Sequence, residues 1–279
     1  MTTESNAPPA RGNEVAVSIK WHVKDGPQMI EFQSTRDLVT PREIVSSLGS
    51  LVDQVAAATV AALERAGGSV SCRRGCDACC HQLASVSDME AHAIGAVVAA
   101  MPDDKRARLM ARFEEAARVI DARFGPGALD AGVMDEDRHG LAMEYFKLRL
   151  ACPFLEDSSC AIYDERPLIC REYMVSSPAE NCWKLGEAEV ETIVYGLPAA
   201  GAQRMTGFNN DYASRRVALA LLPRWLAANE PPAPRSGVDW MFAYMGGLKA
   251  MEAEIAARRE KAEAEAAAEA PLAGPPEPA

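Results

Sequence analysis

The residues most capable of chemistry in this chain are its eight cysteines, which fall into two groups. In the first group two residues separate Cys76 from Cys79, and Cys80 follows directly. Two thiolates at that spacing can bind one metal ion at about 2.3 Å, and Gly75 gives the backbone the freedom that such a tight turn requires. All eight are candidate metal ligands, namely Cys72, Cys76, Cys79, Cys80, Cys152, Cys160, Cys170 and Cys182.

The number of metal centres stays open at this point. Eight thiolates could fill two four-thiolate sites, form one cluster with spare thiols, or bridge a binuclear site. The side chains of adjacent cysteines diverge, so Cys79 and Cys80 serve together most easily if they face different metals. Thiolates suit zinc, copper(I) and iron–sulfur centres. The expected cofactor is zinc or iron, the iron as an ion or as an iron–sulfur cluster.

Three other roles for the cysteines compete with metal binding. Structural disulfides are disfavoured because the first residues, MTTESNAPPARGNE, lack the basic start and apolar stretch of a secretory signal. From this we expect a cytoplasmic protein with reduced thiols. A role as small buried apolar residues does not explain why all eight lie in two compact groups. A redox or catalytic dithiol formed by Cys76 and Cys79 is the third alternative.

Composition excludes two classes of partner from our expectations. The 279 residues carry a formal net charge of −11, which disfavours a general nucleic-acid binder because phosphate neutralisation needs a basic face. The apolar run over residues 91–101 falls far short of the roughly 20 residues that cross a bilayer, so we expect no membrane partner. Phosphate-binding glycine loops and the HExxH and GxSxG motifs are absent, so no catalytic residue is assigned.

The elements around the cysteines are predicted to be mainly helical. Alternating apolar residues over 15–23, a turn at 24–27 and a return over 29–32 predict a small hairpin within residues 1–39. Thr40 with Glu43 and Ser87 with Glu90 form capping boxes, which predict helices starting at those points. Helices are predicted over residues 40–66, 87–100, 103–124, 141–150, 212–228 with a kink at Pro223, and 238–259, with a helical turn over 166–172 and a short strand over 190–195.

These elements give a mainly α fold, a helical scaffold around an irregular cysteine-ligated region. We expect a tail and hairpin over residues 1–39, a metal-binding domain over 40–200, and C-terminal helices over 201–259 that pack on it. Residues 260–279, rich in Ala and Glu and ending in PLAGPPEPA, are expected to be a disordered acidic tail.

The second cysteine group carries a family resemblance. It begins with the sequence CPFL at Cys152 and continues with CAIYDERPLICR from Cys160. With the earlier CxxCC run, this resembles the YkgJ-type cysteine cluster family, also called CxxCxxCC proteins and described as zinc- or iron-chelating. The resemblance spans residues 72–182, but three residues, not the family's two, separate Cys72 from Cys76.

The resemblance implies metal binding and supplies no reaction. It makes the expected function that of a cytoplasmic protein holding one or two cysteine-ligated metal centres. Some flagellin lysine methylases carry a related motif. The alternative is therefore an iron–sulfur-dependent enzyme or redox protein, acting on proteins in one version, that uses the same cysteines.

Residues beside the cysteines have two interpretations each. Arg166 and Arg171 either balance thiolate charge, or Arg166 forms a salt bridge with a neighbouring carboxylate at position 164, 165 or 172. Tyr163 is predicted to belong to the core, and His81 could replace a cysteine as a ligand.

Overall fold

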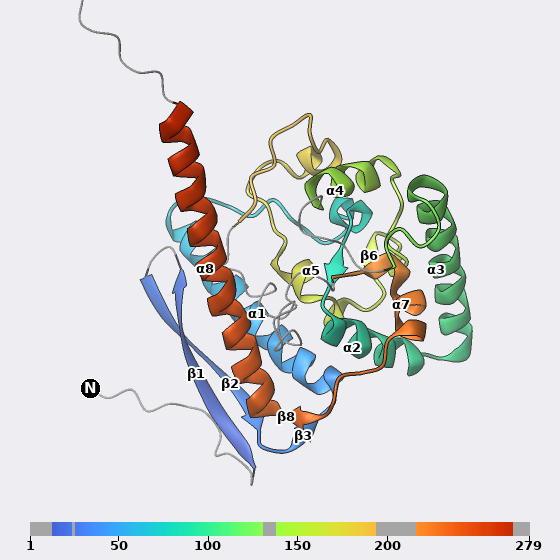
Figure 1. Ribbon diagram of the computed structural model, residues 1–279. Helices are drawn as coiled ribbons and strands as arrows, with labels where there is room; N and C mark the ends of the chain where they lie inside the picture. The colour runs from blue at the N-terminus through green and yellow to red at the C-terminus, as the bar shows by residue number, and fades with distance from the viewer. Residues whose placement is uncertain (1–12, 24–25, 131–137, 194–215, 270–279) are drawn as a thin grey trace, which may run out of the picture.

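The computed structural model describes residues 13–23, 26–130, 138–193 and 216–269 (Figure 1). Its helices are α1 (Pro41–Arg65), α2 (Asp88–Ala99), α3 (Asp103–Phe124), α4 (Arg138–Lys147), α5 (Leu168–Glu172), α7 (Leu222–Ala228) and α8 (Gly237–Glu269). Its strands are β1 (Glu14–Val23), β2 (Gly26–Thr35), β3 (Leu38–Val39), β4 (Ser85–Val86), β5 (Leu155–Glu156), β6 (Ser159–Cys160), β7 (Val217–Ala218) and β8 (Arg235–Ser236). Short 3₁₀ turns are η1 (Ala78–His81), η2 (Tyr163–Glu165), η3 (Ala179–Trp183) and η4 (Leu219–Leu221). The predicted mainly α fold is confirmed.

The predicted N-terminal hairpin is present as β1 and β2, an antiparallel pair running from Glu14 opposite Thr35 to Val23 opposite Gly26. Its side chains alternate as a half-buried strand requires. Ile19, Ile30 and Phe32 are buried, whereas their neighbours along each strand face solvent. The hairpin thereby covers one side of the first core.

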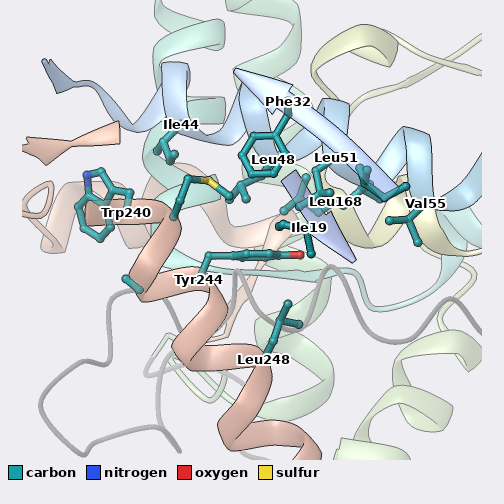
Figure 2. Packing of buried hydrophobic residues seen from close by; sticks show 14 of the residues in the cluster. Ile19, Phe32, Ile44, Leu48, Leu51, Val55, Leu168, Trp240, Tyr244 and Leu248 are labelled. Carbon is teal, nitrogen blue, oxygen red and sulfur yellow. The ribbon is translucent and has the colours of Figure 1, made fainter. Parts of the chain in front are cut away.

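The first core lies between the hairpin, α1 and α8 (Figure 2). Helix α1 contributes Ile44, Leu48, Leu51 and Val55 at helical spacing. Helix α8 lies across α1 and adds an aromatic and aliphatic stripe, of which Tyr244 is completely buried (Figures 1 and 2). By length and apolarity alone α1 could cross a bilayer, but half of its apolar window is buried inside the protein. Its apolar face therefore serves this core.

The second core lies on the other side of α2, against α3 and α7. Phe113 of α3 meets Phe154, two residues beyond Cys152, edge to face with ring centroids 5.3 Å apart. Two short antiparallel pairs close the fold over long sequence distances, because β3 pairs with β8 and β4 pairs with β7. The contact of Phe154 with α3 and the pairing of β4 with β7 thus hold segments that neighbour the cysteines against this core.

Several predicted boundaries are wrong. Where a helix over 212–228 was predicted, Val217 and Ala218 form strand β7, a 3₁₀ turn follows, and α7 begins at Leu222. Pro223 lies in the first turn of α7, where the missing N–H of proline has no intrahelical partner to lose, so it starts the helix instead of kinking it. Residues 212–215 lie outside the described part.

Other elements differ by a few residues. Helix α4 begins and ends three residues before the predicted 141–150, and α8 runs to Glu269, ten residues beyond the predicted end. The predicted strand over 190–195 is represented by one bridge from Thr192 to Val175, and its last two residues lie outside the described range. The helices over 41–65, 88–99 and 103–124 match their predicted bounds within two residues.

Candidate metal centre

The first cysteine group folds into two consecutive tight turns. The amide of Cys76 donates to Arg73 O at 3.0 Å, with Gly75 at a φ of +83° that only glycine adopts without strain. The amide of Cys80 then donates to Asp77 O at 2.8 Å and opens the 3₁₀ turn η1. These turns shape the backbone of the first group, whose four thiols lie within nine residues of the sequence.

The second group is held in a small hairpin. Strands β5 and β6 pair Leu155 with Cys160 across a turn in which Asp157 and Ser158 both have positive φ. The amide of Leu155 donates to Cys152 O at 2.9 Å, which folds Cys152 back toward the same turn.

A backbone hydrogen bond joins the two groups directly. The amide of Cys152 donates to Cys80 O at 2.7 Å, so segments far apart in the sequence meet at their cysteines. All eight cysteines are free thiols.

Cys182 belongs to the second cysteine group in the sequence, but in the structure it packs beside the first group. It lies in η3, which contacts η1, and it is 4% exposed. Its buried neighbours are Ala78 and Val175, and Cys72 and Cys76 pack against the same cluster. The amide of Ser71 donates to Val175 O at 2.9 Å and fixes this side. We call Cys72, Cys76 and Cys182 the first triad.

We call the three cysteines of the second sequence group that precede Cys182, namely Cys152, Cys160 and Cys170, the second triad. Cys152 and Cys160 pack against the second core, and Cys170 lies in the short helix α5. Burial raises the pKa of Cys152 to about 12, and the neighbouring Cys160 thiolate adds to that rise. Burial likewise raises the pKa of Cys170, and repulsion from Cys152 and Cys160 contributes.

Cys79 and Cys80 end the first group, and Cys80 O accepts the hydrogen bond from the amide of Cys152. A hydrogen bond between their side chains is the largest cause of a raised pKa for Cys79. Repulsion from Cys79 also raises the pKa of a member of the first triad, Cys182, and of a member of the second, Cys170. As whole residues Cys79 and Cys170 are exposed to solvent. Burial is nevertheless a leading cause of the raised pKa of each thiol.

Two arginines place positive charge at the second triad. Arg112 of α3 donates to Leu155 O at 3.1 Å and pairs with Glu156, and its guanidinium opposes the burial that raises the pKa of Cys152. Arg166 in the same way opposes the rise in the pKa of Cys160, whose leading cause is burial. Arg166 thus fits the predicted charge-balancing role, whereas Arg112 was not singled out by the sequence because no local pattern links α3 to Cys152.

Arg171 has a structural role. Its Nη1 donates to Asp53 Oδ2 of α1 at 2.6 Å, and its Nε donates to Arg166 O at 3.1 Å. Arg166 also reaches Asp53, at 3.9 Å, so the carboxylate partner lies on α1 and is none of the three near Arg166 in sequence. The prediction that Tyr163 belongs to the core is wrong, because its side chain is 57% exposed and the Arg166 guanidinium lies 4.1 Å from its ring centroid.

Three residues that lie beside cysteines in the sequence or near them, His81, Arg149 and Trp183, contact one another. Their contacts join three segments that carry cysteines. His81 follows Cys80, and its Nδ1 lies 3.1 Å from Arg149 O. Its ring lies 4.8 Å from that of Trp183, the residue after Cys182. Arg149 Nη2 donates to Trp183 O at 2.8 Å. His81 is therefore placed as a structural partner of these segments.

A buried carboxylate fixes the helix that carries Cys170. Glu90 is 2% exposed, and its Oε2 accepts from the amide and hydroxyl of Ser87 at 3.0 and 2.9 Å. Its Oε1 accepts from the amide of Leu168, the first residue of α5, at 2.8 Å. The sequence identified Glu90 only as a helix cap, because its bond to α5 spans 78 residues.

The donor set fits a soft metal by its chemistry. Eight free thiols converge from two segments, and cations flank the second triad. Within the described residues, however, no three Cys, His, Asp or Glu side chains lie close enough together to hold a metal ion. The structure brings the thiols into one region without closing them around a point.

Comparison with known proteins points the same way. Residues 71–190 match the family model CxxCxxCC, described as "Putative zinc- or iron-chelating domain". No curated protein and no solved structure matches the chain. The matched residues include all eight cysteines.

Proposed function

We propose, from the match of residues 71–190 to the CxxCxxCC family model, that this is a cytoplasmic protein whose eight cysteines hold one or two thiolate-ligated zinc or iron centres. One observation supports this above the rest. Two cysteine groups far apart in the sequence are joined by the Cys152 amide and Cys80 O, and no cysteine is spent on a disulfide. A bound zinc or iron ion would supply the cross-link that these irregular segments otherwise lack.

The protein groups prepare the region for metal in two ways. Burial raises the pKa of most of these thiols, for example of Cys152 to about 12, so they are protonated at neutral pH and a metal must displace protons to bind. Arg112 and Arg166 then offset part of the thiolate charge that results.

Elemental analysis of protein purified without air tests the proposal. We expect zinc or iron in stoichiometric amounts. A chelator should lower the melting temperature and make the cysteines react with a thiol reagent, since the loops over residues 152–182 have little regular structure of their own. The control is the same chelator saturated beforehand with zinc. Unchanged thermal stability and unchanged thiol protection after chelation would refute metal ligation.

An iron–sulfur-dependent enzyme or redox protein is a second candidate, favoured by the solvent access to Cys79 and Cys170. A cluster needs four thiolates, so eight would leave some free to react. Brown protein with visible absorption after anaerobic purification supports this candidate. Colourless protein with stoichiometric zinc excludes it.

A further inference from the structure

We propose that the outer edge of strand β1 pairs with the same edge of a second copy of this chain. The two β1 strands run antiparallel and are centred on Val17, so that two hairpins join into one four-stranded sheet. The proposed interface contains no cysteine, so it is independent of the proposed metal binding and goes beyond it.

The hydrogen-bonding pattern of the hairpin shows which backbone groups of β1 face outward. Strands β1 and β2 pair residue for residue from Glu14 opposite Thr35 to Val23 opposite Gly26. One step before this ladder, the amide of Arg36 donates to Asn13 O at 2.9 Å. Hydrogen-bonded pairs alternate along an antiparallel ladder, so the odd-numbered residues of β1 bond to β2. The amides and carbonyls of the even-numbered residues therefore point away from β2.

The two edges of the hairpin differ in their protection. On β2, Pro27 occupies an outward-facing position and has no amide to donate, and α8 begins beside Ser34 and Thr35. Strand β1 lies on the outer side of the hairpin, away from α8 (Figure 1). Within the described residues β1 pairs with no strand other than β2, and its ten residues include no proline. A long edge of this kind is a template for pairing with another chain.

The apolar face of the hairpin is only partly buried on β1. Ile30 and Phe32 of β2 are 4% and 7% exposed, whereas Val15 and Val17 of β1 are half-buried. When two β1 strands pair around Val17, Val15 lies opposite Ile19 of the second copy and the two Val17 residues lie opposite each other. Opposed β-branched side chains on one face stabilise a sheet, so the second strand completes the burial of these valines.

Charge complementarity favours a second copy as the partner and sets the register. Glu14 and Lys20 are exposed and lie three residues to either side of Val17, so each lies opposite the other in the second copy. Ala16 lies opposite Ser18 in the same way. These are even-numbered positions, whose outward amides and carbonyls form the new ladder. Moving the centre by one residue loses both opposite-charge pairs.

Sedimentation equilibrium of the full chain over a concentration series, in a non-thiol reductant, tests the proposal. We expect a reversible dimer. Ser18→Pro removes an outward amide and leaves the bonds to β2 in place, so this variant should fold and remain monomeric. Ser18→Ala keeps that amide and is the matched control, with an expected dissociation constant close to that of wild type.

Charge reversal tests the register. Lys20→Glu places two pairs of like charges opposite each other in the dimer and should raise its dissociation constant by about tenfold. Adding Glu14→Lys exchanges the two charges and should return the dissociation constant toward that of wild type. Loss of a role that either charge has within its own chain would not be repaired by the exchange.

Three results overturn the proposal, namely wild type that stays monomeric at its highest soluble concentration, a dimer that Ser18→Pro leaves unchanged, and an exchange variant that does not recover. Should Ser18→Pro fail to fold by circular dichroism, hydrogen exchange of the wild type decides. The amides of Ala16, Ser18 and Lys20 should gain protection as the concentration rises. Equal protection of these amides at every concentration also overturns the proposal, because another segment of the same chain then covers the edge.

Discussion

Replacing Glu90 tests the stability of the fold most directly, because its carboxylate accepts hydrogen bonds both from its own helix cap and from a residue far away in the sequence. It completes the capping box of α2 with Ser87 and also accepts from the amide of Leu168 at the start of α5. Glu43 performs only the local task, in the same type of capping box with Thr40 at the start of α1, and it is exposed. Comparing Glu90→Ala with Glu43→Ala therefore isolates burial and the bond to α5.

The expected cost follows from the donors left behind. Glu90→Ala leaves the amides of Ser87 and Leu168 buried without an acceptor, and an unsatisfied buried donor costs about 1–3 kcal/mol. We expect a loss of about 2–4 kcal/mol in the free energy of unfolding. In a chain of this size that corresponds to roughly 5–15 °C in melting temperature. Glu43→Ala should cost only about 0.3–1 kcal/mol, since water replaces the lost acceptor.

The pH dependence of the two variants should have opposite signs. Burial raises the pKa of Glu90 in spite of its hydrogen bonds, so the folded state binds more protons than the unfolded state above pH about 4.5. The stability that Glu90 contributes is then lost as the pH rises through its folded pKa. The backbone hydrogen bond from Thr40 lowers the pKa of Glu43, so its contribution is present above pH about 4.5 and is lost as the pH falls through its folded pKa.

Urea unfolding of the two variants and of wild type across pH 4–8 measures both effects. The cost of Glu90→Ala should shrink as the pH rises, while the cost of Glu43→Ala should grow. Equal costs for the two variants at every pH would refute the reasoning, because the bond to Leu168 would then contribute nothing measurable.

Two further comparisons test the packing around the site, each by thermal or urea unfolding. Arg171→Ala breaks the charged hydrogen bond of a side chain that is 9% exposed and should lower the free energy of unfolding by about 2–3 kcal/mol. Arg42→Ala removes an exposed ion pair and should lower it by less than about 1 kcal/mol. Similar losses for the two variants would argue against a structural role for the bond from Arg171 to α1. Gly237→Ala puts its Cβ about 3.0 Å from Thr35 O and should destabilise the folded protein. In Gly246→Ala the new Cβ meets nothing within 4 Å, so this variant should stabilise α8 by about 0.5–1 kcal/mol. A stabilising effect of Gly237→Ala would contradict the close approach of α8 to the hairpin.

The parts of the fold that sequence predicted well are those fixed by near neighbours. Both capping boxes have the predicted partners, Thr40 with Glu43 and Ser87 with Glu90. Their hydrogen bonds span three residues, so the sequence contains all the information that sets them. The hairpin of β1 and β2 is local in the same sense, with a two-residue connection between its strands.

The segment before α7 was mispredicted because a distant partner decides its structure. The apolar run over residues 217–221 fits a helix as well as a strand. Pairing of Val217 with Val86 and of Ala218 with Ser85 selects the strand. No pattern within the run reveals β4, more than 130 positions earlier.

The candidate site divides in the same way. The sequence predicted the eight cysteines as candidate ligands from their type and spacing, but the neighbours of Cys182 depend on the return of the chain at Val175. Arg112 and Arg149 reach the cysteine region from α3 and from the end of α4, and neither belongs to the motif that drew attention to the region. Supporting residues recruited from other elements lack a spacing rule, so the structure is needed to find them.

The pairing of β3 with β8 has a consequence for the order of synthesis. The first core needs Trp240, Tyr244 and Leu248 from α8, which the ribosome releases only after both cysteine groups have emerged. Domains generally fold as units during translation, and this core cannot close until its last helix arrives. Both cysteine groups therefore precede, in the order of synthesis, the residues that complete the first core.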